Sequence, residues 1–397
     1  MRSEWNKSPL SEIVSLTIDH RGLTPKKLGG DWSDTGYRAL SAKNVKTGRI
    51  VQVDSIRRVS ESMYHKWMPE EIRRKDILIT SEAPFGEVYL WDSEEKIVLS
   101  QRLFGVRISD AFDPVFVYYY MLTDMFQGDM RSRATGTTVI GLRQPELLKC
   151  SICYPELKIQ KRISGILRDI DKKIRVNEEI NENLLQQMES LYKAWFKDYV
   201  PFGGQCPPDW KEADIYSIAD IIYGAPFASK LFNTDRHGLP IIRIRDLKEQ
   251  AFVTYTTEQH PKGHLIKPGD IVVGMDGEFR PYIWGNTEAW LNQRVCIFDN
   301  KRPKGKAFVL FTIKPLLYQI EQTQVATTVI HIGKKDYDAF EFLLPDTDTL
   351  DQFDSITAPM IDRIVNNCLE NKRLAVMRDT LLPRLMSGEL DVSALDL

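Results

Sequence analysis

The hydrophobic positions of the chain first show a short-range pattern that is typical of strands. Apolar runs of four to six residues, bounded by Gly, Pro, Asp and Asn, predict strands followed by turns. The segment "PVFVYYYMLTDMF" (114–126) instead has the length and periodicity of a buried helix. Together these segments predict lobes of mixed α+β structure. The clearest strand segments are "DILIT" (76–80), "EVYLW" (87–91), "GDIVV" (269–273) and "QRVCIF" (293–298).

A second pattern, with a spacing near 3.5 residues, predicts two long helices that form a coiled coil. Each helix of about 37 residues would be some 55 Å long at 1.5 Å per residue. Gly165 and Pro359 should weaken or kink these helices near their N-terminal ends. The stripe of the first helix returns 190 residues later. The predicted core positions are Ile163, Ile170, Ile174, Asn177, Asn181, Leu184 and Leu191 in the first helix, and Phe353, Met360, Ile364, Asn367, Asn371, Leu374 and Leu381 in the second.

Each stripe carries two asparagines at its centre, and these predict how the helices align. One apolar stripe alone is explained equally well by a helix packed on its own lobe. Two matched stripes are most simply buried against each other. In an antiparallel pair Asn177 would face Asn371, and Asn181 would face Asn367. Buried asparagine fixes the register of a coiled coil at some cost in stability, so we expect these amides to set the alignment.

The stripes belong to an internal repeat that covers the whole chain. Because its blocks keep their order, each half consists of one lobe followed by one long helix. The expected domains are a first lobe at 1–155, a first helix at 156–199, a second lobe at 200–345 and a second helix at 346–397. An antiparallel helix pair would place these lobes at opposite ends of a rod, with pseudo-two-fold symmetry. The repeated blocks are "TGTTVIGL" (135–142) with "VATTVIHI" (325–332), "GYRALSAKNVKTGRI" (36–50) with "GLPIIRIRDLKEQAF" (238–252), "RRKDILIT" (73–80) with "IKPGDIVVG" (266–274), and "LSQRLFGVRI" (99–108) with "LNQRVCIFD" (291–299).

The composition restricts the kinds of partner. The 53 Lys and Arg residues nearly balance the 55 Asp and Glu residues, which gives a net charge of −2. No overall basic field therefore indicates a nucleic-acid partner, and any such contact must use local patches. No apolar run approaches the roughly 18 residues needed to span a bilayer, and "MRSEWNKSPL" lacks the core of a signal peptide. With five cysteines, an odd number, we expect a cytoplasmic protein with reduced thiols and no membrane partner.

Several segments, in their doubled order, resemble the specificity subunits of type I restriction-modification systems. The run "GTTVIGLRQPELLKCSICYPELKIQKRISGILRDIDKKI" (136–174) resembles the end of a target recognition domain, as do "LFNTDRHGLPIIRIRDL", "IKPGDIVV" and "LNQRVCIF" in the second half. "LYKAWFKDYVPF" (191–202) and "LLPRLMSGELDV" (381–392) resemble the closing segments of the two spacer regions. One departure is "LLPDTDTLDQFDSI" (343–356), which lacks the Q-K-R-I of the first half.

The resemblance implies a fold and a function. Each lobe would be a target recognition domain that reads one half of a bipartite site in double-stranded DNA, and the helices would set the gap between the halves. Two adenine-N6 methyltransferase subunits would dock on the chain, and a motor-nuclease subunit could join them. The chain itself would catalyse nothing and would bind no cofactor or metal.

The motifs expected of an enzyme are missing from the sequence. There is no glycine-rich loop for S-adenosylmethionine, no D/N-P-P-F/Y/W loop for a flipped base and no P-loop. Asp76 with the E-x-K at 94–96 could be arranged around Mg²⁺, but the second half keeps Asp270 without an E-x-K. The lone C-x-x-C at 150–153 falls short of four zinc ligands, and apolar residues stand at the matched positions of the second half. We interpret these cysteines as buried strand residues.

Local charge and side-chain chemistry give the candidate DNA contacts. Residues 37–75 hold ten Lys and Arg against four Asp and Glu, and residues 230–248 hold five against two. Such clusters suit phosphate contact, whereas base reading needs side chains such as Arg, Asn and Gln that match base edges. The predicted contacts are Lys43, Asn44, Arg57, Arg58, Gln101 and Arg102 in the first lobe, and Arg243, Arg245, Asp276, Glu278, Arg280, Gln293 and Arg294 in the second, with Thr137 and Thr327 as possible phosphate contacts.

Two alternatives remain for these residues. The Gln-Arg pairs and the T-T-V segments recur in both halves, so they can instead be elements of the shared scaffold; residues that discriminate bases should differ between the lobes. Two alternatives also remain for the chain: a self-contained methyltransferase or nuclease with diverged motifs, and a coiled-coil interaction scaffold without a DNA role. If the lobes read DNA, helices of this length suggest half-sites about one DNA turn apart or somewhat more.

Overall fold

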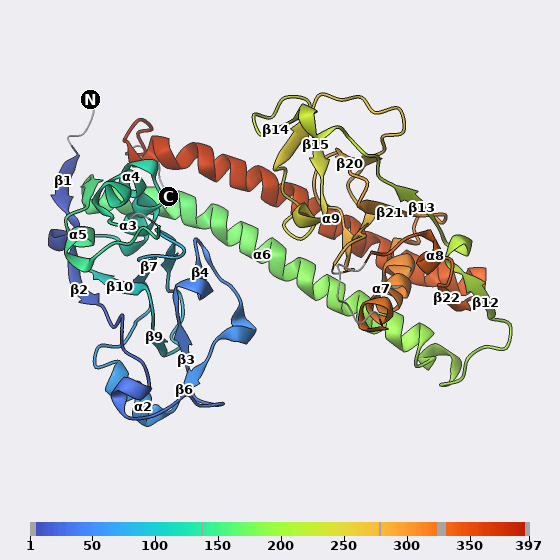
Figure 1. The fold of residues 1–397 in the computed structure, drawn as a ribbon, viewed down its shortest axis with the longest axis horizontal. Coiled ribbons are helices and arrows are strands. Elements are labelled where there is room, and N and C mark those ends of the chain that lie inside the picture. Colours follow the sequence, from blue (N-terminus) through green and yellow to red (C-terminus); the bar gives the residue numbers. More distant parts are fainter. Residues whose placement is uncertain (1–4, 137, 278, 324–330, 394–397) are drawn as a thin grey trace. The chain divides into compact units, whose positions relative to one another are not determined.

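The computed structural model describes residues 5–136, 138–277, 279–323 and 331–393. These residues form two compact units, one of Met1–Lys172 with Val376–Leu397 and the other of Lys173–Ala375. Each unit contains one mixed α+β lobe together with a section of both long helices (Figure 1). The predicted fold class, two similar lobes combined with two long helices, is confirmed.

Two sheets form the lobe of the first unit. A four-stranded antiparallel sheet has the order β2-β10-β7-β8, and a three-stranded sheet has the order β6-β3-β9. In the second sheet β3 and β9 run parallel, with Leu40 beside Leu99. β1 pairs with β11, and β4 with β5. The strands are β1 (Asn6–Pro9), β2 (Val14–Ile18), β3 (Tyr37–Leu40), β4 (Val45–Lys46), β5 (Arg49–Ile50), β6 (Arg58–Val59), β7 (Ile77–Thr80), β8 (Val88–Leu90), β9 (Ile97–Leu99), β10 (Leu103–Ile108) and β11 (Ser151–Tyr154).

The second unit repeats this arrangement. Its antiparallel sheet has the order β13-β21-β18-β19, its other sheet β14-β16-β15-β20-β17, and β12 pairs with β22. Here β15 and β20 run parallel, with Ile242 beside Leu291. The strand segments predicted from the sequence are therefore strands in both lobes. The strands are β12 (Lys211–Asp214), β13 (Ala219–Tyr223), β14 (Phe232–Asn233), β15 (Leu239–Ile242), β16 (Thr254–Thr256), β17 (Leu265–Ile266), β18 (Ile271–Gly274), β19 (Pro281–Ile283), β20 (Ala289–Leu291), β21 (Val295–Asn300) and β22 (Glu341–Leu344).

The helices of the lobes correct one prediction. Residues 114–126 were expected to form one buried helix, but they are divided between α3 and α4 because Thr123 is extended and its hydroxyl accepts a hydrogen bond from the Phe126 N–H at 3.4 Å. Threonine is a favourable N-cap, and apolar periodicity does not reveal a cap. The helices of the lobes are α1 (Leu10–Ile13), α2 (Glu61–Trp67), α3 (Pro114–Met121), α4 (Asp124–Arg133) and α5 (Gln144–Leu148) in the first unit, and α7 (Lys306–Thr323) and α8 (Lys334–Tyr337) in the second.

The two long helices are α6 (Leu157–Phe196) and α9 (Thr347–Met386), each of 40 residues. Both continue without interruption through Gly165 and Pro359. Asp346 caps the start of α9, where its carboxylate accepts hydrogen bonds from the Thr349 N–H and hydroxyl at 2.9 and 2.6 Å. Gly388, with φ of 71°, ends the same helix. Among the described residues, no helix is both long and apolar enough to span a bilayer.

In the first unit α6 and α9 pack antiparallel. Ile163 and Leu167 share a core with Leu385 and Met386. Further along α6 and further back along α9, the Arg378 guanidinium donates to Asp171 at 2.9 Å. This carboxylate also accepts a hydrogen bond from the Tyr119 hydroxyl of α3 at 2.6 Å, so the lobe is joined to the helix pair by a polar network as well as by apolar packing.

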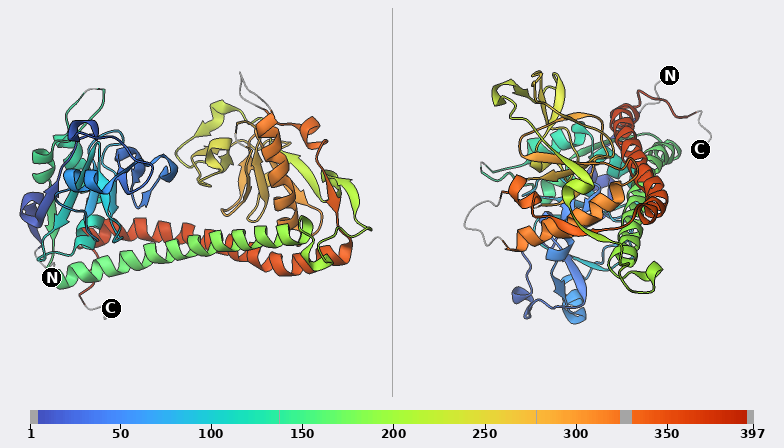
Figure 2. Two further views of the ribbon diagram at one scale, coloured as in Figure 1. Left: turned by 90° about the horizontal axis from the view of Figure 1, so that it is seen from below. Right: turned by 90° about the vertical axis from the view of Figure 1, so that its right-hand side faces the viewer.

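In the second unit the helices are antiparallel too, and the asparagines pair as the alignment predicts. Asn177 donates to the Asn371 carbonyl oxygen at 2.8 Å, and Asn367 donates to that of Asn181 at 2.8 Å. Figure 2 shows α6 and α9 side by side at this section. Every predicted core position is buried or half-buried, whereas Ile356, which also follows the stripe, is 47% exposed.

Candidate nucleic-acid interface

The predicted contact residues follow the parallel strand pair of each lobe. In the first lobe Lys43 lies in the turn after β3, and Gln101 lies two residues after β9. In the second lobe Arg245 follows β15, and Gln293 follows β20. Because the paired strands run in the same direction, their carboxyl ends meet at one edge. The structure therefore brings a cation and an amide to the same edge in both lobes, and all four side chains are exposed.

Backbone hydrogen bonds hold this edge in the same way in each lobe. The Ser100 N–H donates to the Leu40 carbonyl at 2.8 Å, and the Asn292 N–H donates to the Ile242 carbonyl at 3.2 Å. In the first lobe the Ala42 N–H also donates to the Gln101 carbonyl at 3.1 Å. The candidate side chains thus stand on turns that are fixed to the strands.

Asn44 is part of this turn rather than of its surface. It is 1% exposed, and its carbonyl oxygen accepts hydrogen bonds from the Ser41 N–H and hydroxyl at 3.1 and 2.9 Å. Asp246 has the same position in the second lobe and accepts from the Arg243 N–H at 3.1 Å. Burial raises the pKa of Asp246, against the opposing effect of that hydrogen bond. Both residues brace the turn that carries Lys43 or Arg245.

The recurring arginines of the two Gln-Arg pairs are held by carboxylates. Arg102 forms an ion pair with Glu82 at 3.0 Å, and Arg294 lies 3.5 Å from Asp276. The carbonyls of both arginines accept a backbone hydrogen bond, from Ser81 in the first lobe and Met275 in the second, each at 2.9 Å. These contacts support the interpretation that Arg102 and Arg294 are scaffold elements.

Sequence reasoning missed His331. Its Nδ1 lies 2.7 Å from the Asp276 carboxylate and 3.1 Å from the Arg294 guanidinium. Asp276 and His331 are brought together by an isolated β-bridge. A residue 55 positions away along the chain gives no local signal of such a contact.

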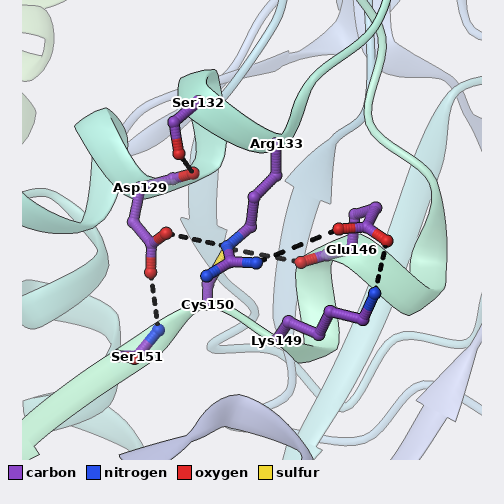
Figure 3. A network of polar contacts seen from close by, with 7 residues as sticks. All are labelled: Asp129, Ser132, Arg133, Glu146, Lys149, Cys150 and Ser151. Carbon is purple, nitrogen blue, oxygen red and sulfur yellow. Dashed lines mark hydrogen bonds and ion pairs between the residues drawn. The ribbon is translucent and has the colours of Figure 1, made fainter.

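The first T-T-V segment falls in the sequence between α4 and α5, and polar contacts link these two helices to each other and to β11 (Figure 3). Arg133 at the end of α4 donates to Asp129 at 2.7 Å and lies 3.9 Å from Glu146 of α5. Asp129 in turn accepts from the Ser151 N–H of β11 at 2.8 Å. The end of α4 is therefore held to α5 and to β11.

Leu142, at the end of the repeated block 135–142, is tied to the residue that follows β7, and the second lobe repeats the contact. The Leu142 N–H donates to the Ser81 carbonyl at 3.0 Å, and the Ile332 N–H donates to the Met275 carbonyl at 2.9 Å. This repetition agrees with a scaffold role for the repeated segment. Thr137, Glu278 and Thr327, which were predicted to contact DNA, lie outside the described residues.

The remaining predicted DNA contacts differ in whether their side chains are exposed or already engaged by other residues of the chain. Arg280 is engaged in a bidentate ion pair with Glu321, and Arg58 donates to the Gly36 carbonyl at 2.7 Å. Arg243 is half-buried beside the braced turn. Arg57 is exposed, and its guanidinium lies over the Trp32 ring at 3.9 Å from the ring centre.

A cavity of about 270 Å³ opens beside this stacked arginine. Two of its lining residues, Trp32 and Trp67, were not predicted from the sequence. A lone tryptophan in a polar stretch carries no sequence signal for a site, because most such residues serve the core. The residues that line the cavity include Trp32, Lys43, Ser55, Arg57, Trp67 and Gln101.

The residues considered for catalysis have structural roles. Asp76 is 2% exposed and pairs with Arg107 at 2.8 Å, while Lys96 of the E-x-K pairs with Glu71 at 2.7 Å. Burial raises the pKa of the Cys150 thiol to about 12. Among the described residues, no group of three or more His, Cys, Asp and Glu side chains could hold a metal ion.

Comparisons with known proteins agree on one family. The family model "Type I restriction modification DNA specificity domain" matches residues 2–186. The type I restriction enzyme MjaIX specificity subunit of Methanocaldococcus jannaschii is 23% identical over 340 residues, which cover 80% of this chain and 78% of that protein. The EcoBI specificity subunit of Escherichia coli is 36% identical over 127 residues, covering 32% of this chain and 27% of that protein.

A solved structure shares the fold. The crystal structure of the type I restriction-modification S subunit from M. genitalium aligns with a TM-score of 0.58 at 15% identity and covers 96% of both chains. The relatives are named as specificity subunits of restriction enzymes, in agreement with the expectation that this chain is the non-catalytic subunit. Residues 2–186 match the family of type I restriction-modification DNA specificity domains, and over 80% of its length the chain is similar to a type I specificity subunit.

Proposed function

We propose that this chain reads a bipartite sequence in double-stranded DNA, with one half-site assigned to each lobe. The observation that carries the proposal is the repeated edge at the ends of the parallel strands. The turn after one strand presents Lys43 or Arg245, and the turn after the other presents Gln101 or Gln293. Cationic side chains suit phosphate contact, and amides suit base edges. The similarity to type I specificity subunits makes DNA the expected ligand of this edge.

The long helices would set the distance between the half-sites. A helix of 40 residues is about 60 Å long at 1.5 Å per residue, and one turn of DNA is roughly 34–36 Å. We therefore expect half-sites about one turn apart or somewhat more. The asparagine pairs support this role because they oppose sliding of one helix along the other.

The chain would also assemble the modification enzyme. Two adenine-N6 methyltransferase subunits would dock on equivalent surfaces of the repeated scaffold, and a motor-nuclease subunit could join the same complex. The support for this part of the proposal is the internal repeat, because a repeated surface offers the same partner two equivalent positions.

A selection from a random duplex library, read out by gel shift with the full chain and its methyltransferase subunit, tests this function. The expected product is a set of duplexes with two conserved clusters separated by an unconserved gap of fixed length. Absence of DNA binding would favour a coiled-coil scaffold without a DNA role, and binding without sequence preference would contradict sequence reading. Binding of S-adenosylmethionine by the chain alone would favour an enzyme instead.

A further inference from the structure

The cavity of the first lobe gathers hydrogen-bond donors that have no acceptor. The Arg57 guanidinium contacts the Trp32 ring, but no described residue forms a hydrogen bond or an ion pair with it. Among the described residues, none forms a hydrogen bond or an ion pair with the Lys43 ammonium either. The Trp67 side chain is 1% exposed, and its Nε1 N–H is buried without an acceptor in the described structure. Such unpaired donors are costly when they are buried, and an acceptor-rich ligand would satisfy them.

Trp32 fixes the direction of the Arg57 donors. A guanidinium stacked on an indole ring is restricted to a plane parallel to the ring, because the cation–π contact acts on its flat face. The N–H groups then remain available along the edge of the guanidinium. An arginine held in this way loses less side-chain freedom when it makes two parallel hydrogen bonds.

The chemistry of these donors selects among the bases. In the major groove guanine presents two acceptors, O6 and N7, whereas adenine combines the N7 acceptor with an amino donor and cytosine presents an amino donor. Arginine has five donors and no acceptor, so its fork matches guanine alone in a bidentate manner. A carboxylate beside Arg57 would weaken this preference, but the lining residues of the cavity include neither Asp nor Glu.

The second lobe differs at this place. With the alignment that matches Gly36 with Gly238, Thr234 stands where the first lobe has Trp32. The stacked arginine is therefore a feature of one lobe, as expected for a residue that distinguishes one half-site from the other.

We propose that Arg57, positioned by Trp32, reads a guanine in the half-site of the first lobe. This inference rests on the proposed function, because it assigns a base to a lobe that is itself proposed to read DNA. Arg57 would make the contact, and Trp32 would act as a positioning residue. Gln101, at the same cavity, is available for a neighbouring base or for the same pair.

The test uses the full chain assembled with its methyltransferase subunit and a random duplex library. The wild-type complex should select a guanine at one position that Arg57→Ala no longer selects, with the other half-site unchanged. At that position the preference for guanine should fall by about 5- to 150-fold, the range of a bidentate base contact. Arg73→Ala is a matched control, because Arg73 is an exposed cation of the same lobe and does not line the cavity.

Substitutions of Trp32 test the positioning role. Trp32→Phe keeps an aromatic face and should keep the guanine preference, whereas Trp32→Leu should reduce it toward the level of Arg57→Ala. Thermal unfolding of each variant checks that the lobe remains folded. Equal loss of preference in both Trp32 variants, with unchanged unfolding, would contradict the stacking argument.

The results that would overturn the inference are distinct from those against the proposed function. If Arg57→Ala weakens binding to all duplexes equally and leaves the base preferences intact, Arg57 contacts a phosphate. If the first half-site of the wild type contains no guanine sensitive to Arg57, the base assignment is wrong. A wild-type complex that selects no sequence at all would overturn the proposed function, and the inference with it.

Discussion

Asn181→Leu should destabilise the helix pair more than the double variant Asn181→Leu/Asn367→Leu. Asn367 is 1% exposed, and its amide donates to the Asn181 carbonyl oxygen at 2.8 Å. Replacing Asn181 alone leaves this donor buried without its acceptor, which costs about 1–3 kcal/mol. Replacing both residues removes both polar groups and puts apolar leucine side chains of similar shape in their place. The double variant should therefore be as stable as the wild type or more stable.

The assay is urea unfolding of the full chain, followed by circular dichroism at 222 nm for the transition in which the helices are lost. The double-mutant cycle should give a coupling free energy of about 1–3 kcal/mol between the two positions. Asn183→Leu is a matched control, because Asn183 lies on the exposed face of α6 and the same substitution there should change stability by about 0.5 kcal/mol or less.

Simple additivity of the two single substitutions would show that Asn181 and Asn367 do not stabilise each other. Extending the change to Asn177 and Asn371 should raise stability further while it allows alternative alignments of the helices. Crosslinking mass spectrometry should then detect more than one set of cross-helix neighbours in the quadruple variant. A single set, with no gain in stability, would show that the amides do not specify the register.

Three further predictions follow from the same structure. Hydrogen bonds from Thr349 hold the pKa of Asp346 below its usual value, so the stabilisation that this cap provides is present above about pH 4 and is lost as the pH falls through the lowered folded-state pKa. Asp346→Ala should therefore lower the free energy of unfolding by about 1 kcal/mol at neutral pH, and the difference from the wild type should shrink in acid unfolding titrations. A difference that stays constant with pH would exclude this cap. Lys43→Ala and Arg245→Ala should each weaken DNA binding across sequences and lower the slope of log affinity against log salt by about one; binding titrations that show unchanged slopes would remove these residues from the phosphate contacts. Deleting one matched heptad from both α6 and α9 shortens each helix by about 10 Å, so selection experiments should recover a gap shorter by roughly three base pairs, and an unchanged gap would exclude the helices as the spacer.

The repeat and the long helices could be predicted from the sequence because they follow from periodicity. The same stripe occurs twice at a fixed shift, and the asparagines within it mark equivalent positions. From these features alone the antiparallel alignment places Asn177 opposite Asn371, and the structure pairs their side chains. The break between α3 and α4 was missed because a single cap, Thr123, interrupts a continuous apolar pattern.

The candidate site was only partly predictable. Residue chemistry identified Arg57 and Lys43 as candidates, but it could not reveal that Trp32 lies beneath the guanidinium, since the contact depends on the tertiary fold. Residue chemistry also could not distinguish an amide exposed to solvent from one that stabilises a turn. Asn44 has the chemistry of a base reader, but it is buried in its own turn. The recurring arginine Arg102 illustrates the value of the repeat, because its ion pair has a counterpart in the other lobe.

The most direct test of a two-lobed DNA reader is to map N6-methyladenine at single-nucleotide resolution in DNA modified by the full chain with its methyltransferase subunit. If each lobe reads one half-site, every modified adenine should lie in a motif of two fixed parts separated by a constant, unspecified gap, and Arg57→Ala should relax one part alone. Methylation within a single uninterrupted motif, or at adenines without a shared sequence, would contradict this account.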